Sequence, residues 1–202
     1  TTIYVDPHTG GGRFANYPAP DLVLITDIHP DHFDTATLAA FHLDQARIVA
    51  PKAVMDLLPA RMQAICTVMN NGDTTDLANA RIEAIPMYNL PPSPDAMHPK
   101  GRGNGYVLTL GGKRIYISGD TQGIPEMRAL KNIDVAFVCM NLPYTMDVDE
   151  AADAVLAFKP KVVYPYHYRG KDRFSDVKKF KELVNAKDPA IEVRQEDWYR
   201  GE

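Results

Sequence analysis

The sequence has little cysteine, and it has no long apolar run. Only two of its 202 residues are cysteine, so a scaffold held together by several disulfides is excluded. Cys66 and Cys139 both lie in apolar, strand-like runs, and we expect them to be small buried residues. No apolar run approaches the length of about 20 residues that a membrane-spanning helix needs. We therefore expect no transmembrane segment.

An excess of positive charge is also lacking. There are 22 Lys and Arg against 26 Asp and Glu, for a net charge of −4. The longest basic cluster, Lys178, Lys179 and Lys181, lies on a helical pattern and indicates a solvated face. Nucleic-acid binding would need a basic patch, so we expect no nucleic-acid partner. A homo-oligomer is compatible with the sequence.

The order of elements predicts one α/β domain over residues 1–202. Runs rich in Val, Ile and Tyr and bounded by Gly, Pro, Asp or Asn predict strands at 2–5, 22–26, 46–50, 65–69, 80–86, 105–110, 113–118, 133–140, 161–166 and 190–194. Apolar positions at helical spacing predict helices at 35–41, 51–58, 124–129, 148–158 and 175–186. Asp147 and Ser175 are the expected N-caps of the last two helices. Gly111-Gly112 predicts a tight hairpin.

The first residues, Thr2 to Pro7, already form a strand pattern, and no Met precedes it. We expect a processed or truncated product. A removed signal peptide is compatible with this start, so cytoplasmic, periplasmic and secreted locations all stay open.

A loop dense in metal-type ligands follows the apolar run 22–25. Its sequence is Thr-Asp-Ile-His-Pro-Asp-His-Phe-Asp, residues 26–34, and it supplies Asp27, His29, Asp31 and His32. Imidazole is the commonest metal ligand, and a carboxylate supplies a hard oxygen donor beside it. A solvated polar loop is the ordinary alternative, but this density of His and Asp favours a metal site.

Three further candidates lie at strand ends or in a long loop. Asp120 follows the predicted strand 113–118, and His167 follows 161–166. His98 lies in the Pro- and Gly-rich stretch 89–104, which predicts a long ordered loop, and such loops are often functional. Each would more often be structural if taken alone, but together they predict convergence at one edge of a sheet.

These motifs resemble those of the metallo-β-lactamase superfamily. The match is Asp27-x-His29-x-Asp31-His32, then His98, Asp120 and His167, in order and with typical gaps. The segments 3–7, 105–108, 115–121 and 164–167 are similar to a branch of small metal-dependent hydrolases related to ascorbate-6-phosphate lactonase and N-acyl-phosphatidylethanolamine phospholipase D. The resemblance covers nearly the whole chain.

The resemblance implies a four-layer αββα sandwich whose opening hairpin is partly missing here. It also implies two divalent ions, zinc first and manganese or iron as alternatives. Asp27, His29 and His98 would hold one ion, and Asp31, His32 and His167 would hold the other. Asp120 would bridge the two.

Asp27 departs from the superfamily pattern, which has His at this position. A carboxylate is the harder donor, so it should shift the preference toward manganese or iron. Asp27 could also weaken binding of the ion at this site. Alternatively, it could contact no ion and instead orient His29 or His98. We favour the interpretation in which Asp27 binds the ion directly.

The resemblance implies a small-molecule substrate and hydrolysis of its ester, lactone or amide-type bond by hydroxide held on the metals. Asp31 or Asp120 would hold or accept its proton, and Asn141 and Tyr144 could donate hydrogen bonds to the oxyanion. Lys100 and Arg102 beside His98 could instead meet a phosphate, which fits a metal-dependent phosphodiesterase. A third alternative is a metal-binding protein without turnover.

Overall fold

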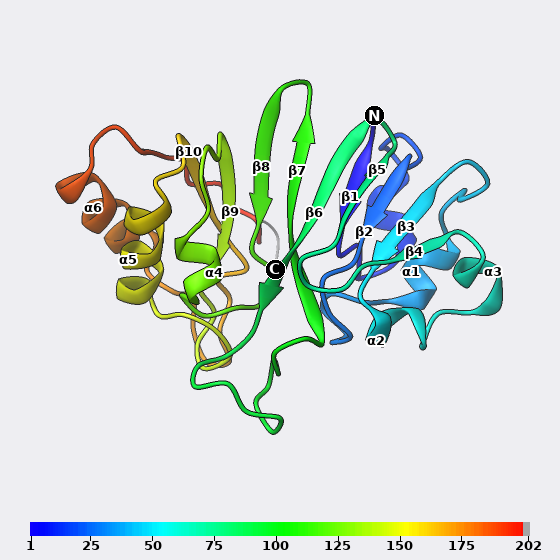
Figure 1. Cartoon of the computed structure of the whole chain (residues 1–202), viewed down its shortest axis with the longest axis horizontal. Coiled ribbons are helices and arrows are strands. Elements are labelled where there is room, and N and C mark those ends of the chain that lie inside the picture. Colours follow the sequence, from blue (N-terminus) through cyan, green and yellow to red (C-terminus); the bar gives the residue numbers. More distant parts are fainter. Residues whose placement is uncertain (200–202) are drawn as a thin grey trace.

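The computed structural model describes residues 1–199 and has two β-sheets packed face to face (Figure 1). The smaller sheet has four parallel strands in the order β1 (Ile3–Val5), β2 (Leu22–Leu24), β3 (Arg47–Ala50) and β4 (Cys66–Val68). Helices cover its outer face, so this half supplies one β layer and one α layer.

The larger sheet has seven strands in the order β11-β10-β9-β8-β7-β6-β5. Their bounds are β5 Thr74–Leu77, β6 Ala80–Met87, β7 Gly103–Leu110, β8 Lys113–Ile117, β9 Val135–Cys139, β10 Val162–Tyr166 and β11 Glu192–Val193. Strands β5 to β8 are antiparallel to their neighbours, whereas β8 to β11 run parallel. The predicted Gly-Gly hairpin is confirmed: Gly111 and Gly112 join β7 to β8 with φ of 56° and 74°.

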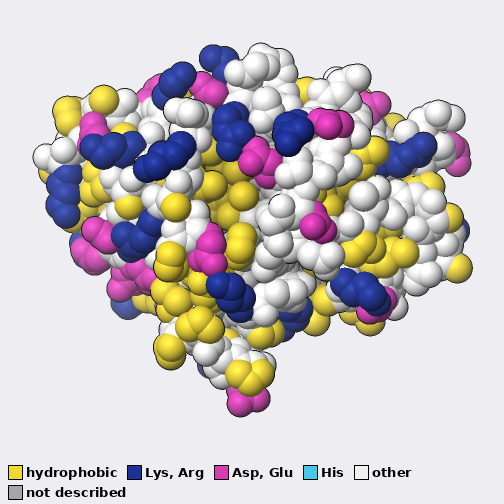
Figure 2. All heavy atoms as spheres, in the orientation of Figure 1, with side chains coloured by type: hydrophobic (Ala, Val, Ile, Leu, Met, Phe, Trp, Pro, Cys, Tyr) yellow, Lys and Arg dark blue, Asp and Glu magenta, His cyan; other side chains and the backbone are white. Residues whose placement is uncertain are grey.

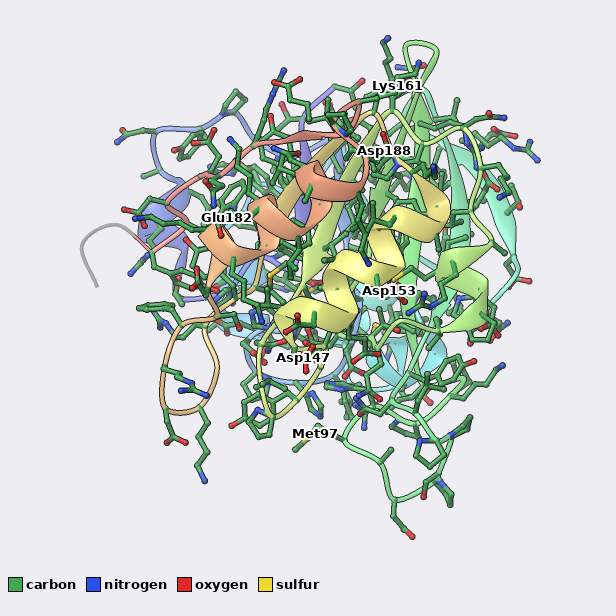
Figure 3. The ribbon with its side chains drawn as sticks, turned by 90° about the vertical axis from the view of Figure 1, so that its left-hand side faces the viewer. Met97, Asp147, Asp153, Lys161, Glu182 and Asp188 are labelled. Carbon is green, nitrogen blue, oxygen red and sulfur yellow. The ribbon has the colours of Figure 1, made fainter. Side chains whose placement is uncertain are left out.

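The helices form the two outer layers. They are α1 Thr35–Ala39, α2 Lys52–Met55 and α3 Ala60–Gln63 on the smaller sheet, and α4 Pro125–Arg128, α5 Val148–Phe158 and α6 Val177–Lys187 on the larger one. A 3-10 turn spans Gly11–Phe14. Figure 3 shows α5 and α6 lying side by side across the larger sheet. The layers confirm the predicted αββα sandwich.

Successive side chains of residues 22–25 point to opposite faces of the smaller sheet, and both faces are buried. Leu22 and Leu24 pack between the sheets against Tyr106, whereas Val23 and Ile25 pack beneath the helices with Leu38 and others. All four side chains of 22–25 are fully buried. A continuous apolar run is typical of a parallel strand buried on both faces.

Several local predictions need correction. The helix expected at 51–58 is shorter, because α2 ends at Met55 and Pro59, which has no N–H to continue a helix, is the N-cap of a separate helix, α3. Strand β5 was not predicted, because 74–77 has few apolar residues. Asp176, not Ser175, caps α6, since Ser175 instead donates to the carbonyl of Met140. Asp147 caps α5 as predicted.

The carboxyl ends of β2, β8, β9 and β10 lie at the same end of the sandwich. The start of β7 lies at this end too, because the backbone amide of Asn104 donates to the carbonyl of Thr26 at 2.9 Å, and the long loop between β6 and β7 leads into it. Figure 3 places Met97, beside His98, at the same end as Asp147 and opposite Lys161 and Asp188. The predicted ligands are therefore delivered to one edge.

The surface carries charges of both signs, and Figure 2 shows them interspersed over one face. Among residues 1–199, none of the helices has the length and apolar character that a bilayer span requires.

Candidate metal centre

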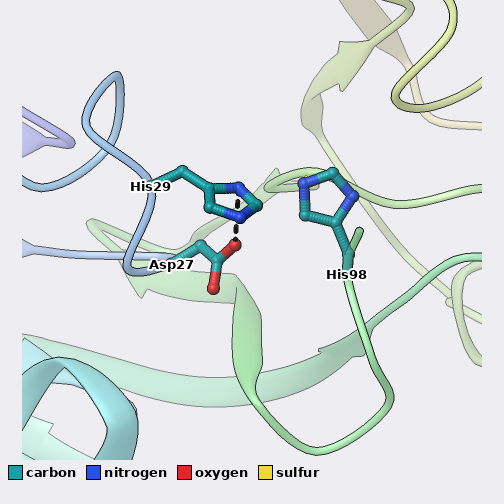
Figure 4. A group of neighbouring side chains, drawn as sticks. All are labelled: Asp27, His29 and His98. Carbon is teal, nitrogen blue, oxygen red and sulfur yellow. Dashed lines mark ion pairs between the residues drawn. The ribbon is translucent and has the colours of Figure 1, made fainter. Parts of the chain in front are cut away.

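A first group of predicted ligands consists of Asp27, His29 and His98. Asp27 and His29 follow β2, and His98 reaches across from the loop between β6 and β7 (Figure 4). Nδ1 of His29 lies 3.2 Å from Oδ2 of Asp27. One donor atom from each residue lies within 4.8 Å of the other two, a spacing suited to one ion.

A second group consists of Asp31, His32 and His167, and its donor atoms meet the same 4.8 Å criterion. His167 immediately follows β10 and has a φ of 45°, in the left-handed region that non-glycine residues rarely adopt. Its Nε2 lies 3.4 Å from Oδ2 of Asp31. Such backbone strain is common where a side chain must be aimed at a site.

Asp120 lies between the two groups. Its Oδ2 is 3.3 Å from Nε2 of His98 and 3.5 Å from Nε2 of His32, and its Oδ1 is 3.3 Å from Nε2 of His167. The preceding Gly119 has a φ of 60°, and a Cβ there would lie 2.5 Å from Sδ of Met87. This sharp turn after β8 brings Asp120 to the centre, and its role as a bridging ligand stays a prediction.

The polar atoms at this centre fit a metal ion. Within residues 1–199, three buried ligand atoms make no hydrogen bond: Nε2 of His32, Nε2 of His98 and Oδ1 of Asp120. Buried polar atoms are normally satisfied, so a converging set without hydrogen bonds needs a partner. Imidazole nitrogen together with carboxylate oxygen is a donor set that binds zinc, manganese or iron.

Sequence reasoning assigned no role to Asp6, which immediately follows β1. Asp6 accepts hydrogen bonds from the Thr26 amide at 2.8 Å and the Thr26 hydroxyl at 2.6 Å. Its Oδ2 also lies 2.8 Å from Nδ1 of His32. This contact leaves Nε2 of His32 facing the centre, the arrangement in which a carboxylate orients a metal-binding imidazole.

Asn89 has the same relation to His98 and was also missed. Its Oδ1 lies 3.1 Å from Nδ1 of His98 and accepts the His98 amide at 2.8 Å. The contact again leaves Nε2 facing the centre. Asn89 lies in the loop that the sequence marked as functional, but nothing in the pattern singled out this residue.

The charges of the second group and Asp120 stabilise one another in the metal-free protein. Burial opposes ionisation, but the charges of His32 and His167 hold the pKa of Asp120 well below its usual range. Burial likewise opposes protonation of His167, but Asp120 and a hydrogen bond to Asp31 raise its pKa to about 9. For Asp31, the His167 hydrogen bond and the nearby imidazoles outweigh burial and lower the pKa to about 2. In the metal-free protein, protonated imidazoles therefore supply the positive charge that a bound cation would otherwise supply.

The sequence left open that Lys100 and Arg102 could meet a phosphate, but in the structure both pair with carboxylates of the chain. Nζ of Lys100 pairs with Glu126 at 2.7 Å, outside the cluster. Arg102 turns inward and forms a bidentate pair with Asp27, in which Nε lies 2.9 Å from Oδ1 and Nη2 lies 2.6 Å from Oδ2. Asp27 is fully buried and needs a partner of this kind.

Asn141 reaches the second group, as expected for a residue that follows β9. Its Nδ2 lies 3.3 Å from Nε2 of His167, and its Oδ1 accepts from Thr145 at 2.5 Å. Tyr144 contributes its backbone carbonyl, which accepts from Asn89 at 2.8 Å. The oxyanion role of both side chains stays a prediction.

Two other features border the centre. A groove of about 500 Å³ lies beside Asp31, His32 and His167, and its other walls are mainly apolar side chains from the facing sheets. Cys139 is buried nearby, and burial raises the pKa of its thiol to about 11. The interpretation of this cysteine as an inert residue fits that surrounding.

The sequence and the fold both match known proteins. The Beta-lactamase superfamily domain matches residues 1–168. A UPF0173 metal-dependent hydrolase of Pyrococcus abyssi is 31% identical over 202 residues, covering 95% of this chain and 88% of the relative.

Two solved structures share the fold. A candidate metal-dependent hydrolase from Parabacteroides distasonis is 41% identical with a TM-score of 0.82, over 96% of this chain and 83% of that one. Igni18, a metallo hydrolase from Ignicoccus hospitalis, is 26% identical with a TM-score of 0.78, over 96% and 87%. The chain therefore belongs to the β-lactamase superfamily, among its metal-dependent hydrolases.

Proposed function

We propose that the protein hydrolyses an ester, lactone or amide-type bond of a small molecule. The observation that carries the proposal is the convergence of three buried ligand atoms without hydrogen bonds, from His32, His98 and Asp120. His167 and Asp31 complete a set of donors around the same point. Zinc is the first expectation for this set, with manganese and iron as alternatives.

The residues around the ligands orient them before any ion binds. Asp6 and Asn89 hold the rings of His32 and His98 through Nδ1 and leave Nε2 free for an ion. When bound, a divalent ion would lower the pKa of water toward ~7 and so supply hydroxide at neutral pH.

Asp31 is the better placed of the two carboxylates to handle the proton of the attacking water. Its side chain is 51% exposed, whereas that of Asp120 is 4% exposed. The lowered pKa of Asp31 keeps it ionised at neutral pH, so it can accept a hydrogen bond from water. Asp120, held from three sides by imidazoles, has the position of a fixed ligand.

Asn141 is the candidate donor to a developing oxyanion. Thr145 occupies its Oδ1, so Nδ2 is left as the donor that faces His167. A donor fixed before the reaction stabilises charge without reorganising during the reaction. The half-buried Tyr144, three residues along, is the second candidate.

Cleavage of a phosphodiester is the alternative that relatives in the superfamily suggested. It is less favoured because Lys100 and Arg102, the cations nearest His98 in sequence, are engaged with Glu126 and Asp27. A metal-binding protein without turnover is the remaining alternative.

One panel separates these functions. Metal-loaded protein is assayed with lactones, aryl esters, aryl amides and aryl phosphodiesters, before and after stripping with chelator. We expect turnover of a carboxylic substrate that is lost with the metal and in Asp120→Asn, but retained in the exposed control Asp44→Asn. Turnover of phosphodiesters alone would favour the phosphodiesterase, and no turnover across the panel would favour the binding protein.

A further inference from the structure

We propose that Arg102 makes the two ligand groups unequal, so that the second group fills with metal first and the first group binds an ion only weakly. The inference rests on the metal dependence in the proposed function, and it holds whichever bond is cleaved. It begins from the contacts of Arg102, which lies in the loop between β6 and β7 and is 20% exposed.

Arg102 contacts two of the three residues in the first group. Both oxygens of Asp27 receive a guanidinium hydrogen bond, at 2.9 and 2.6 Å. Nη2 also lies 3.2 Å from Nε2 of His29 and donates to the carbonyl of Met97 at 2.7 Å. The guanidinium is therefore fixed at the outer side of this group.

The pairing changes the charge that an incoming ion meets. The charge of Asp27 is cancelled by a cation that cannot lose its proton at any ordinary pH. An ion on Oδ2 of Asp27 would share that oxygen with Nη2, and it would lie close to a fixed positive charge. Asp27 is thus a weaker donor here than an unpaired carboxylate would be.

The second group has no such cation among the described residues. Asp31 contacts His32 and His167, and Asp6 contacts Thr26 and His32. Two carboxylates therefore favour a cation on this side without an opposing Arg or Lys. Asp120 is shared by both groups and does not distinguish them.

His29 shows the same effect of Arg102. Both ring nitrogens of His29 have polar neighbours, Asp27 at Nδ1 and Arg102 at Nε2. His29 can therefore bind an ion only by giving up one of these contacts. Nε2 of His98 in the first group and Nε2 of His32 in the second are both buried without a hydrogen bond, so these two atoms do not distinguish the groups.

The test is a titration of chelator-stripped protein with Co²⁺. Binding is measured by calorimetry and by the visible absorption of the bound ion. Wild type should bind one equivalent tightly and a second at least about tenfold more weakly, on the scale at which residues behind a ligand change metal affinity. His29→Ala should remove only the weak step, and His167→Ala should weaken the tight one.

Arg102→Met should tighten the weak step about tenfold or more and leave the tight step unchanged. Arg102→Lys keeps the charge and should leave the weak step weak. Lys100→Met is the matched control, because it removes a cation from the same loop that pairs with Glu126 and should change neither step.

Two steps of equal affinity in wild type would overturn the inference, even if Arg102→Met proved unfolded by circular dichroism. A weaker second step in folded Arg102→Met would also overturn it, since Arg102 would then be needed to position Asp27 as a ligand. Failure of wild type to bind any Co²⁺ or Zn²⁺ would instead contradict the proposed function itself.

Discussion

Asp120 places one carboxylate oxygen 3.3 Å from Nε2 of His98 and the other 3.3 Å from Nε2 of His167. These two histidines belong to different ligand groups. His98 comes from the loop between β6 and β7, and His167 from the end of β10. A single buried carboxylate thus lies between a loop ligand and a strand-end ligand, and the turn after β8 holds it there.

Asp6→Asn should weaken metal binding about 10- to 100-fold, because the amide cannot match the carboxylate that orients His32. The fold should persist, since an amide oxygen can still accept from Thr26. Titration with Co²⁺ measures the effect, with Asp44→Asn as the exposed control. Unchanged affinity in Asp6→Asn would show that His32 needs no orienting partner.

Asn141→Ala should lower kcat about 10²- to 10³-fold with little change in metal content, because it removes a donor that acts on developing charge. Tyr144→Phe should lower kcat less, since the Asn141 amide is the donor that lies beside His167. Steady-state kinetics on the best substrate of the panel, with metal analysis of each variant, measure both effects. A kcat loss in Asn141→Ala that tracked lost metal would contradict an oxyanion role.

The stability of the metal-free protein should fall as pH rises from 6.5 toward 9. The pKa of His167 is raised from 6.5 to about 9, so its contribution is complete below 6.5 and is lost as the folded protein deprotonates. Asp31, lowered from 3.8 to about 2, contributes above 3.8 and loses its effect as pH falls toward 2.

Thermal unfolding of stripped protein across this range measures the effect. His167→Gln should flatten the loss above pH 6.5, whereas the exposed control His42→Gln should not. Adding metal should reverse the trend, because the ligands must lose their protons to bind it. A flat profile for stripped wild type would contradict the prediction.

Tyr106→Phe should lower the free energy of unfolding by about 1 to 3 kcal/mol, because the carbonyl of Ile25 would lose a buried partner. The Tyr106 hydroxyl donates to this carbonyl at 2.8 Å and so ties β7 of one sheet to the end of β2 in the other. Denaturant unfolding measures the loss, with Tyr17→Phe as an exposed control. Equal stability would mean that water replaces the bond.

The strand and helix pattern predicted an α/β domain with candidate ligands at strand ends, whereas the αββα layers and the grouping of the ligands came from the resemblance to the superfamily. Buried strands leave continuous apolar runs, as at 22–25, and Asp27, Asp120 and His167 each lie shortly after such a run. Asp120 and His167 could be found in this way although they are far apart in the sequence. Their neighbours Gly119 and Tyr166, which are 47 positions apart, are joined by a hydrogen bond from the Gly119 amide to the Tyr166 hydroxyl.

The supporting contacts could not be predicted, because they depend on pairings between distant segments. Arg102 and Asp27 are 75 residues apart, and Asp6 and His32 are 26 apart. The sequence shows two charged residues in each case but does not show that they meet. The same limit explains why the sequence did not show that Arg102 faces Asp27.

The most direct test is the metal content of protein purified without chelator or added metal, measured by elemental mass spectrometry. We expect at least one equivalent of zinc, manganese or iron per chain, and its loss in a variant that carries both His32→Ala and His167→Ala. A protein that held no metal, and regained none when zinc, manganese and iron were supplied, would contradict the assignment of this cluster as a metal centre.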